Sequence, residues 1–384
     1  MTSLDTALLH RAEVVVDLDA IAANTAVLRE RAGRPLMAVV KADGYGHGLV
    51  PAARAALAGG ADALGVAVVA EALALRAAGV TAPLLAWLHA PGEDFAAALA
   101  ADVEVSVNAD WGLAEVVAAA RATGRTARLH LCADTGLSRE GATPADWPGL
   151  VAAAARAQAD GDVEVVGLWS HMAYADAPTH PTIGRQVRVF EEAVDIARAA
   201  GLTGARRHLA NSAATIALPE TWYDMVRPGV AVYGLDPLGG DPAAYGLRPA
   251  MTVQAQVALT KRVPAGAGVS YGHTYSAPRE TTLALVPVGY ADGVPRAAGN
   301  RAPVLAAGAQ RTIAGRVCMD QFVLDVGDDA VAPGDRVVLW GPGDGGEPTA
   351  QQWADALDTI HYELVTRVGG RFRRRHVGTA GTGR

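Results

Sequence analysis

Short apolar runs alternate with longer alanine-rich segments from residue 13 to about residue 235. This alternation is typical of βα units in a parallel sheet, whose strands are buried on both faces and therefore read as unbroken apolar runs. Strands are predicted at residues 14–18, 36–40, 63–68, 84–88, 103–107, 128–131, 163–169 and 207–210. Eight such units favour a TIM (β/α)8 barrel over an open doubly wound sheet, although a count of units does not by itself exclude the open sheet.

The clearest helical pattern lies between the last two of these strands, at residues 181–200. Its apolar positions are Ile183, Val187, Phe190, Val194 and Ala197. This spacing of three and four residues places them on one face of a helix, so an amphipathic helix is predicted here.

The pattern changes after Leu235 through a Gly/Pro-rich link. Residues 251–260 alternate apolar and polar positions with one break at Ala258, which predicts a half-exposed antiparallel strand. Further strands are predicted at residues 282–288, 303–307, 311–326 and 336–340, and a helix at 350–357 with Thr349 as its N-cap. We therefore expect an N-terminal extension (1–12), an α/β barrel (13–240), a mostly-β C-terminal domain (241–378) and a flexible tail (379–384).

Composition narrows the class of protein. A net charge of −7 without a sustained basic run argues against nucleic-acid or anionic-membrane binding, and the one local run, RFRRRH, is predicted to be a solvated strand edge. No apolar stretch is long enough to span a bilayer, so a cytoplasmic protein is expected. Cys132 and Cys318 lie far apart without metal-ligand spacing, and neither a disulfide scaffold nor a metal site is predicted.

The segment LMAVVKADGYGHGL ends a buried run in Lys41, one of only two lysines in the chain. A partly desolvated lysine can form an imine, whereas an arginine stays protonated and cannot, so Lys41 is a Schiff-base candidate. The three glycines that follow suit a loop that approaches a ligand closely. An ordinary surface lysine after a strand is the alternative, and this segment alone leaves both interpretations open.

Other polar residues also follow predicted strands, where a barrel gathers its reactive groups. His171 follows VEVVGLWS, and an Asn-Ser pair follows RRHLA. Arg227 comes just before Gly229 and Val230, whose backbone N–H groups suit a phosphate.

These segments together resemble the alanine racemases. The resemblance begins with VVKADGYGHG and continues in order through SHMAYAD, HLANSAA, VRPGVAVYGL, GVSYGHTY, GYADG, CMDQ and TIHYELVTR, over nearly the whole chain. It implies a pyridoxal 5'-phosphate enzyme that interconverts L- and D-alanine for peptidoglycan supply, with the cofactor bound covalently to Lys41.

The resemblance also implies roles for particular residues. The cofactor would be bound by Lys41, Tyr45, His171, Asn211, Ser212, Arg227, Gly229, Val230 and Tyr362. His171 would pack against the pyridine ring and Arg227 would face its nitrogen. The substrate would meet Arg139, the backbone N–H of Met319, and Tyr290 at the entrance.

Racemisation removes a proton from one face of Cα and delivers one to the other, which favours two bases. Lys41 would be one of them. The resemblance implies that Tyr271, from the partner subunit of a head-to-tail homodimer, is the other. A strand-edge aromatic in a Gly-rich turn is the alternative for Tyr271.

One position departs from the family pattern. The family segment is of the type HLK.DTG..R.G, and its lysine is commonly carbamylated, which forms an anion that orients the arginine. This chain has Cys132 there, and a buried thiol is usually neutral. Chloride, Asp134, a Cys132 thiolate or no group at all could then orient Arg139. The alternatives to an intact racemase are a racemase of broader specificity and a weakly active cofactor-binding paralogue.

Two other classes of protein share parts of this pattern. Pyridoxal-phosphate decarboxylases of basic amino acids have the same two-domain architecture but place an acidic partner at the ring nitrogen, against which Arg227 argues. The pyridoxal-phosphate homeostasis proteins are barrels without a β domain, against which the segment after Leu235 argues.

Overall fold

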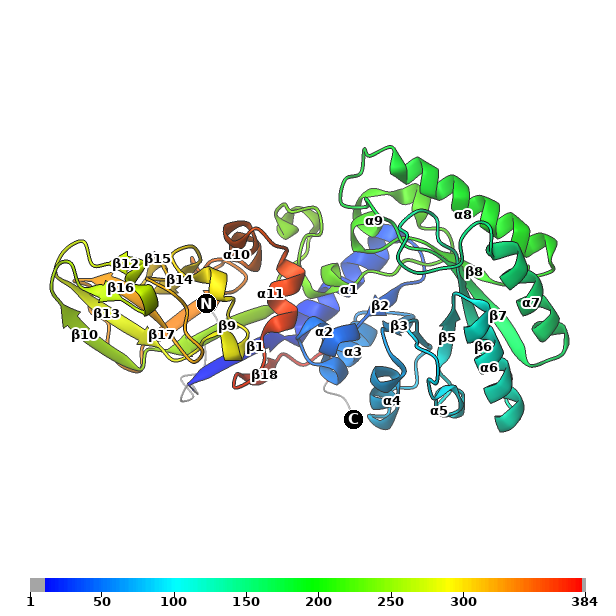
Figure 1. Cartoon of the computed structure of the whole chain (residues 1–384), viewed down its shortest axis with the longest axis horizontal. Helices are drawn as coiled ribbons and strands as arrows, with labels where there is room; N and C mark the ends of the chain where they lie inside the picture. Colours follow the sequence, from blue (N-terminus) through cyan, green and yellow to red (C-terminus); the bar gives the residue numbers. More distant parts are fainter. Residues whose placement is uncertain (1–10, 382–384) are drawn as a thin grey trace. The chain divides into compact units, whose positions relative to one another are not determined.

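The computed structural model describes residues 11–381, and the chain forms two compact units (Figure 1). The first, the barrel unit, contains residues 21–44, 49–247 and 380–381. The second, the β unit, contains residues 11–20, 45–48 and 248–379. No helix in the described part of the chain is long and apolar enough to cross a membrane.

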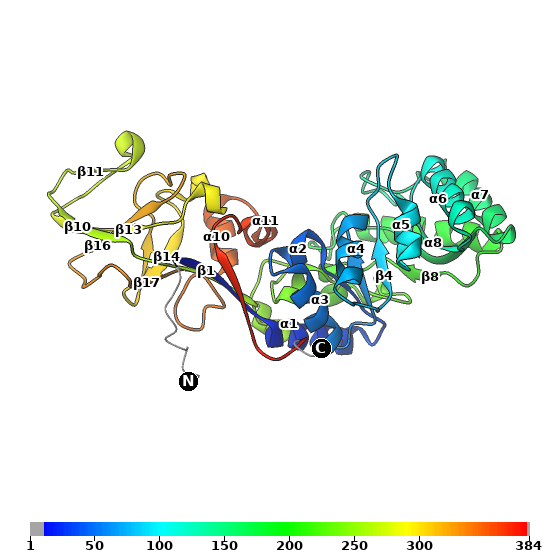
Figure 2. The same cartoon turned by 90° about the horizontal axis from the view of Figure 1, so that it is seen from below.

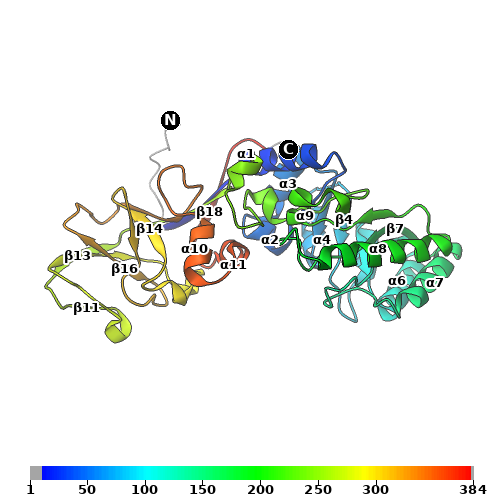
Figure 3. The same cartoon turned by 90° about the horizontal axis from the view of Figure 1, so that it is seen from above.

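The barrel unit is built on parallel strands that pair in chain order. They are β2 (Met37–Val39), β3 (Ala63–Val66), β4 (Leu84–Ala86), β5 (Glu104–Val107), β6 (Ala127–Cys132), β7 (Val163–Trp169) and β8 (Arg206–His208). Helices α4 to α8 lie outside these strands (Figures 2 and 3). Strands β2, β3 and β4 are short and wholly buried, which explains their unbroken apolar sequences, whereas β5 to β8 also carry polar residues.

An irregular segment, residues 224–228, closes the barrel. On one side the backbone N–H of Met37 donates to the Val226 carbonyl at 2.9 Å. On the other side the N–H of Arg227 donates to the Ala210 carbonyl at 2.9 Å. This segment therefore occupies the eighth strand position, between β8 and β2. The predicted barrel is confirmed, and the alternative of an open sheet is excluded.

The prediction that residues 14–18 form the first barrel strand is wrong. That strand exists as β1 (Ala12–Asp17), but it pairs with two strands of the β unit. A local apolar pattern predicts a strand without identifying its partners, because the partners lie more than 200 residues away in the sequence.

Helices connect the strands of the barrel. They are α1 (Leu18–Ala32), α2 (Lys41–Tyr45), α3 (Leu49–Ala58), α4 (Val69–Ala77), α5 (Phe95–Ala100), α6 (Asp110–Thr123), α7 (Trp147–Ala159), α8 (Thr182–Ala199) and α9 (Ser212–Ala217). Three 3-10 turns follow: η1 (Pro219–Thr221), η2 (Val230–Tyr233) and η3 (Pro242–Tyr245). Helix α8 confirms the amphipathic helix predicted at residues 181–200, with Ile183, Phe190 and Val194 buried.

The β unit contains a six-stranded sheet in the order β15-β14-β17-β9-β1-β18 and a three-stranded sheet in the order β10-β13-β16. Its strands after β1 are β9 (Met251–Gln256), β10 (Leu259–Val263), β11 (Gly268–Val269), β12 (Tyr275–Ser276), β13 (Thr281–Val286), β14 (Pro303–Ala306), β15 (Ala309–Thr312), β16 (Phe322–Gly327), β17 (Arg336–Trp340) and β18 (Arg373–Val377). Its helical segments are η4 (Tyr271–His273), η5 (Tyr290–Asp292), η6 (Arg296–Ala298), α10 (Ala350–Leu357) and α11 (His361–Arg367).

Two of the strands predicted for this unit are each divided in the structure. Residues 251–260 form β9 and β10, which belong to different sheets, and the break in alternation at Ala258 lies between them. Residues 311–326 form the end of β15 and then β16, with the CMDQ segment in the loop between them.

Other local predictions for the β unit hold. Thr349 caps α10, and its hydroxyl accepts from the Gln352 N–H at 3.2 Å. The basic run near the C-terminus lies in β18, an edge strand. The predicted tail is partly fixed, because the Thr379 N–H donates to Asp19 at 2.8 Å. The predicted N-terminal extension lies almost wholly outside the described residues.

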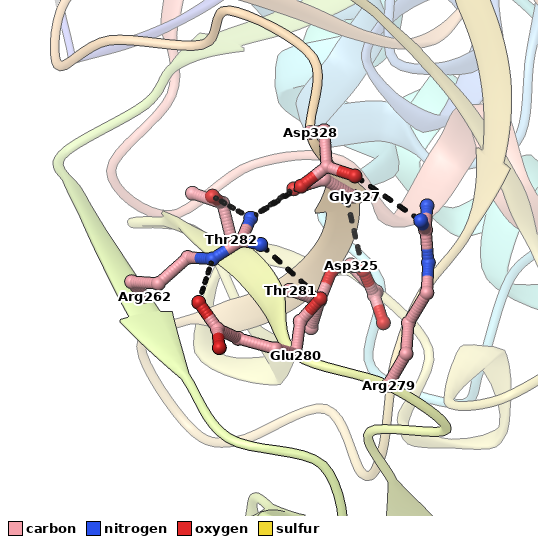
Figure 4. A network of polar contacts seen from close by, with 8 residues as sticks. All are labelled: Arg262, Arg279, Glu280, Thr281, Thr282, Asp325, Gly327 and Asp328. Carbon is pink, nitrogen blue, oxygen red and sulfur yellow. Dashed lines mark hydrogen bonds and ion pairs between the residues drawn. The ribbon is translucent and has the colours of Figure 1, made fainter.

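A polar network joins the strands of the three-stranded sheet (Figure 4). Asp325 on β16 accepts hydrogen bonds from the Thr281 hydroxyl, from the Gly327 N–H at 3.0 Å and from the Tyr275 hydroxyl at 2.7 Å. Burial opposes ionisation of Asp325, but these hydrogen bonds outweigh it and lower the pKa of the carboxyl. Because Tyr275 lies on β12, Asp325 fastens the β11–β12 hairpin to the sheet.

We expect Asp325→Asn to lower the free energy of unfolding by about 1–3 kcal/mol, since an amide cannot accept all three bonds as a carboxylate does. The loss should be full above the ordinary carboxyl pKa of 3.8 and should disappear as the pH falls through the lower pKa of the folded state. Urea denaturation at several pH values measures both effects.

Asp328 in the same network is the matched control. Its carboxylate is 60% exposed and pairs with Arg262 and Arg279 at the surface. Asp328→Asn should change stability much less than Asp325→Asn does, because water screens an exposed ion pair. Equal losses from the two substitutions would contradict the role given to Asp325.

Candidate active site

Lys41 lies just beyond the carboxyl end of β2, at the mouth of the barrel. Its Nζ is 5.7 Å from the ring centroid of Trp87. Burial lowers the pKa of Lys41, and the positive charges of Arg139 and Arg227 lower it further, while Glu140 and Glu71 act in the opposite direction. A lysine whose pKa is lowered by desolvation is a better nucleophile at neutral pH.

The backbone after Lys41 turns in the left-handed sense. Ala42 and Asp43 have φ values of 54° and 55°, and Gly44 continues the turn at 62°. Such a conformation costs roughly 1–2 kcal/mol for each residue that is not glycine. The Glu71 carboxylate offsets this cost by accepting from the Ala42 N–H at 2.7 Å, and Asp43 accepts from the Leu49 N–H at 2.7 Å. The strained turn fixes the direction in which Lys41 leaves the strand.

Arg227, in the segment that closes the barrel, is buried among polar groups. Its guanidinium donates to the carbonyls of His208 and Ser170, at 2.6 and 2.8 Å, and lies 5.0 Å from the ring centroid of Trp169. Burial lowers the pKa of Arg227 to about 10, so the group still carries its charge at neutral pH.

A series of hydrogen-bonded side chains, which the sequence analysis missed, leads from Arg227 through two histidines to Glu104. Glu104 Oε2 lies 2.9 Å from His130 Nε2, His130 Nδ1 lies 2.8 Å from His208 Nε2, and Arg227 Nη1 lies 3.2 Å from His208 Nδ1. Burial, and then the charge of Arg227, lower the pKa of His208 well below its usual value, so it is neutral. Since Arg227 can only donate, His208 Nδ1 accepts and His208 Nε2 carries the proton that it donates to His130 Nδ1. His130 Nε2 then donates to Glu104.

A sequence signal for this chain existed. His130 interrupts the otherwise apolar stretch Leu129–Cys132 of β6. Gly167 on β7 leaves the space that the His130 ring occupies, because a side chain at that glycine would overlap the ring. A glycine inside a strand often marks the close approach of another group.

A second cluster lies where α9 begins and the closing segment ends. The Ser212 hydroxyl accepts from the backbone N–H of Gly229 at 2.8 Å and of Ala231 at 3.3 Å, and Val230 between them is buried. Asn211 is the N-cap of α9 and accepts from the Ala214 N–H at 3.1 Å. Because its oxygen accepts from these two N–H groups, the Ser212 hydroxyl keeps its proton to donate to an anion.

His171 and Arg139 complete the set in the barrel unit. Burial, and then the charge of Arg227, lower the pKa of His171 to about 3, so its ring is neutral. Arg139 Nη2 donates to Glu140 Oε1 at 2.6 Å. The structure thus brings together Lys41, Arg139, His171 and Arg227 at one end of the barrel.

The remaining predicted residues lie in the β unit. The rings of Tyr45 and Tyr362 are 6.4 Å apart. Tyr271 is 71% exposed, and Met319 and Tyr290 are also exposed, at 53% and 43%. The Tyr290 N–H donates to the carbonyl of Cys318, next to Met319, at 3.0 Å.

The hydroxyl of Ser270, next to Tyr271, lies 3.3 Å from the Cys318 sulfur. These contacts connect the loops that present Tyr271, Tyr290 and Met319 to solvent. In the described part of the chain no group of three or more His, Cys, Asp or Glu side chains could hold a metal ion.

Comparison with known proteins covers both units. Residues 16–237 match the family described as "Alanine racemase, N-terminal domain", and residues 250–376 match "Alanine racemase, C-terminal domain". The alanine racemase of Frankia casuarinae is 64% identical over 370 residues, which cover 96% of each chain.

Solved structures are similar over the same length. The alanine racemase of D-cycloserine-producing Streptomyces lavendulae has a TM-score of 0.95 at 54% identity, covering 97% of this chain and 98% of that one. The alanine racemase of Bartonella henselae, solved with covalently bound pyridoxal phosphate, has a TM-score of 0.86 at 26% identity, covering 96% and 100%. With both halves matched and full-length relatives above 50% identity, the chain belongs to the alanine racemase family.

Proposed function

We propose that this chain is an alanine racemase that binds pyridoxal 5'-phosphate through Lys41 and interconverts L- and D-alanine. The observation that carries the proposal is Lys41 itself, a lysine of lowered pKa held by a strained turn beside two arginines. The names of the relatives support the same activity. We further propose that the enzyme acts in the cytoplasm and supplies D-alanine for peptidoglycan.

The residues at the barrel mouth fit this cofactor. Bound pyridoxal phosphate would supply an aldehyde for an amine and a ring that withdraws electrons from the Cα–H bond. Lys41 suits the aldehyde, and the Ser212 hydroxyl, whose oxygen accepts from Gly229 and Ala231 and whose proton is left to donate, suits the phosphate. The backbone of Gly229 is proposed to contact the phosphate as well. The neutral ring of His171 suits a stacking role. Tyr45, Tyr362, Asn211 and Val230 are proposed as further cofactor-binding residues.

Arg227 is proposed to face the pyridine nitrogen. A guanidinium donates hydrogen bonds and accepts none, so it cannot take a proton from that nitrogen as an aspartate would. The chain from His208 to Glu104 holds the guanidinium in place. An unprotonated ring withdraws electrons less strongly, which should suppress side reactions such as transamination.

Two groups are proposed to move the α-proton. Lys41 Nζ serves one face of the substrate, and the Tyr271 hydroxyl of the partner subunit serves the other. The exposure of Tyr271 within its own chain supports a role toward a second subunit. A head-to-tail homodimer follows from this assignment.

The substrate carboxylate is proposed to meet Arg139 and the Met319 N–H, with Tyr290 narrowing the entrance. The Arg139 side chain is 58% exposed, so its guanidinium is open to a ligand. A small pocket would favour alanine.

The direct test is racemisation in D2O. The purified protein loaded with pyridoxal phosphate is incubated with L-alanine, L-serine and L-lysine, and the products are resolved by chiral chromatography and mass spectrometry. Turnover of alanine alone supports the proposal. Turnover of all three would indicate a racemase of broad specificity, and cofactor binding without turnover would indicate a weakly active paralogue.

Lys41→Ala should abolish covalent cofactor binding, seen as loss of the visible absorbance and of the cofactor mass after borohydride reduction. The chain provides its own control, because Lys261 is its only other lysine and lies exposed on β10. Lys261→Ala should retain both signals. Reduced cofactor still attached to the Lys41→Ala protein would remove Lys41 from its role.

Tyr271→Phe should leave cofactor binding intact, because the substitution removes only a hydroxyl. It should slow α-proton exchange from one enantiomer of alanine far more than from the other, since each base serves one face. Tyr174→Phe, at an exposed tyrosine of the barrel unit, is the control. Equal losses of exchange for both enantiomers would contradict the two-base assignment.

A further inference from the structure

Arg139 lies in a closed loop that follows β6. The loop returns to its start, because the Ala142 N–H donates to the Cys132 carbonyl at 2.9 Å and the Asp134 N–H donates to the Ala142 carbonyl at 2.8 Å. Gly141 permits this return: its φ is +98°, and a side chain there would lie 2.5 Å from the Asp134 nitrogen. The residue before Gly141 is therefore held close to Cys132.

That residue is Glu140, and its carboxylate contacts Arg139. The side chain is only 13% exposed, and Oε1 accepts from Arg139 Nη2 at 2.6 Å. Its negative charge acts on Lys41, on the Cys132 thiol and on Arg227 as well as on Arg139. Glu140 is thus a carboxylate that contacts one cation, Arg139, and acts electrostatically on two more, Lys41 and Arg227.

The other groups that could orient Arg139 are engaged elsewhere or uncharged. Asp134 accepts from the N–H groups of Gly136 and Ser138, at 2.9 and 3.1 Å, and so shapes the loop. Burial, and then the charge of Glu140, raise the pKa of the Cys132 thiol well above its usual value, so it carries no charge. Within residues 11–381 the hydrogen bond of the Arg139 guanidinium is to Glu140 alone.

We propose that Glu140 is a positioning residue of the racemase: its carboxylate holds Arg139 by one nitrogen and leaves the rest of the guanidinium to receive the substrate carboxylate. The site then carries its own fixed anion, and the cysteine at position 132 needs no charge. The proposal rests on the proposed function for the identity of the substrate, but the placement of the charge does not depend on it.

The proposal has a kinetic consequence. Glu140→Gln keeps the size of the side chain and removes its charge, so Arg139 loses its orienting partner. We expect KM for alanine to rise roughly 10- to 100-fold in both directions, with a smaller change in kcat, as for other misplaced binding groups. Glu140→Asp should recover most of the loss. Glu164→Gln, at an exposed position of β7, is the control.

A second readout does not require catalysis. With only two lysines in the chain, selective 13C or 15N labelling of lysine gives side-chain NMR signals for Lys41 and Lys261 alone. The charged groups that act on Lys41 are Arg139, Glu140, Glu71 and Arg227. Glu140→Gln removes one of the two negative charges in this set. It should therefore lower the pKa of Lys41 in the cofactor-free protein and leave the Lys261 signal where it is.

The outcomes separate the possibilities. A raised KM together with a lowered pKa of Lys41, both reversed in Glu140→Asp, supports the proposal. An unchanged KM overturns it, and so does a raised KM without any change at Lys41, which would make Glu140 a structural part of the loop. If the wild-type protein does not racemise alanine and Glu140→Gln still lowers the pKa of Lys41, the proposed function is contradicted and the placement of Glu140 is supported.

The response of the enzyme to added bicarbonate and chloride is a further test. The wild-type activity should not respond to either anion, because Glu140 already occupies the position beside Arg139. Chloride should partly restore the KM of Glu140→Gln by replacing the missing charge. A wild-type enzyme that requires added chloride or bicarbonate would overturn the proposal.

Discussion

The repulsion among cations at the mouth of the barrel is the constraint on which the site depends. The charges of Arg139 and Arg227 lower the pKa of Lys41, and the charge of Arg139 lowers the pKa of Arg227. That repulsion, added to burial, keeps His171 neutral and Lys41 reactive. Two carboxylates oppose it at Lys41, Glu140 beside Arg139 and Glu71 beside the left-handed turn. A site built this way favours anionic ligands, and both a phosphate and a carboxylate are anions.

The two proposed bases differ in how firmly the backbone around them is held. Lys41 leaves a left-handed turn that Glu71 and Asp43 hold by hydrogen bonds to the backbone. Tyr271 stands exposed on a short 3-10 turn in a hairpin that Asp325 fastens to its sheet. A group needed on the opposite face of a substrate has to come from a different direction, and an exposed tyrosine on a supported hairpin suits delivery from a second subunit.

Local patterns in the sequence predicted what depends on local forces. The barrel strands, helix α8 and the Thr349 cap were all predicted because burial and capping leave their mark within a few residues. The sheet to which β1 belongs was not, since its partners are distant in the chain. Glu104 is also far from Arg227 in the sequence, so no local motif indicated that it supports Arg227 through His130 and His208. Glu140 directly follows Arg139 in the sequence, but only the closed loop brings its carboxylate near Cys132 and Lys41.

The central claim is that one active site takes Lys41 from one subunit and Tyr271 from the other. Mixing the inactive Lys41→Ala and Tyr271→Phe proteins, with native mass spectrometry to verify that heterodimers form, tests it directly. Each heterodimer would contain one intact site, so random exchange should restore about one quarter of the wild-type activity. A sample that contains heterodimers and stays inactive would contradict the claim, because it would mean that each chain needs both bases of its own.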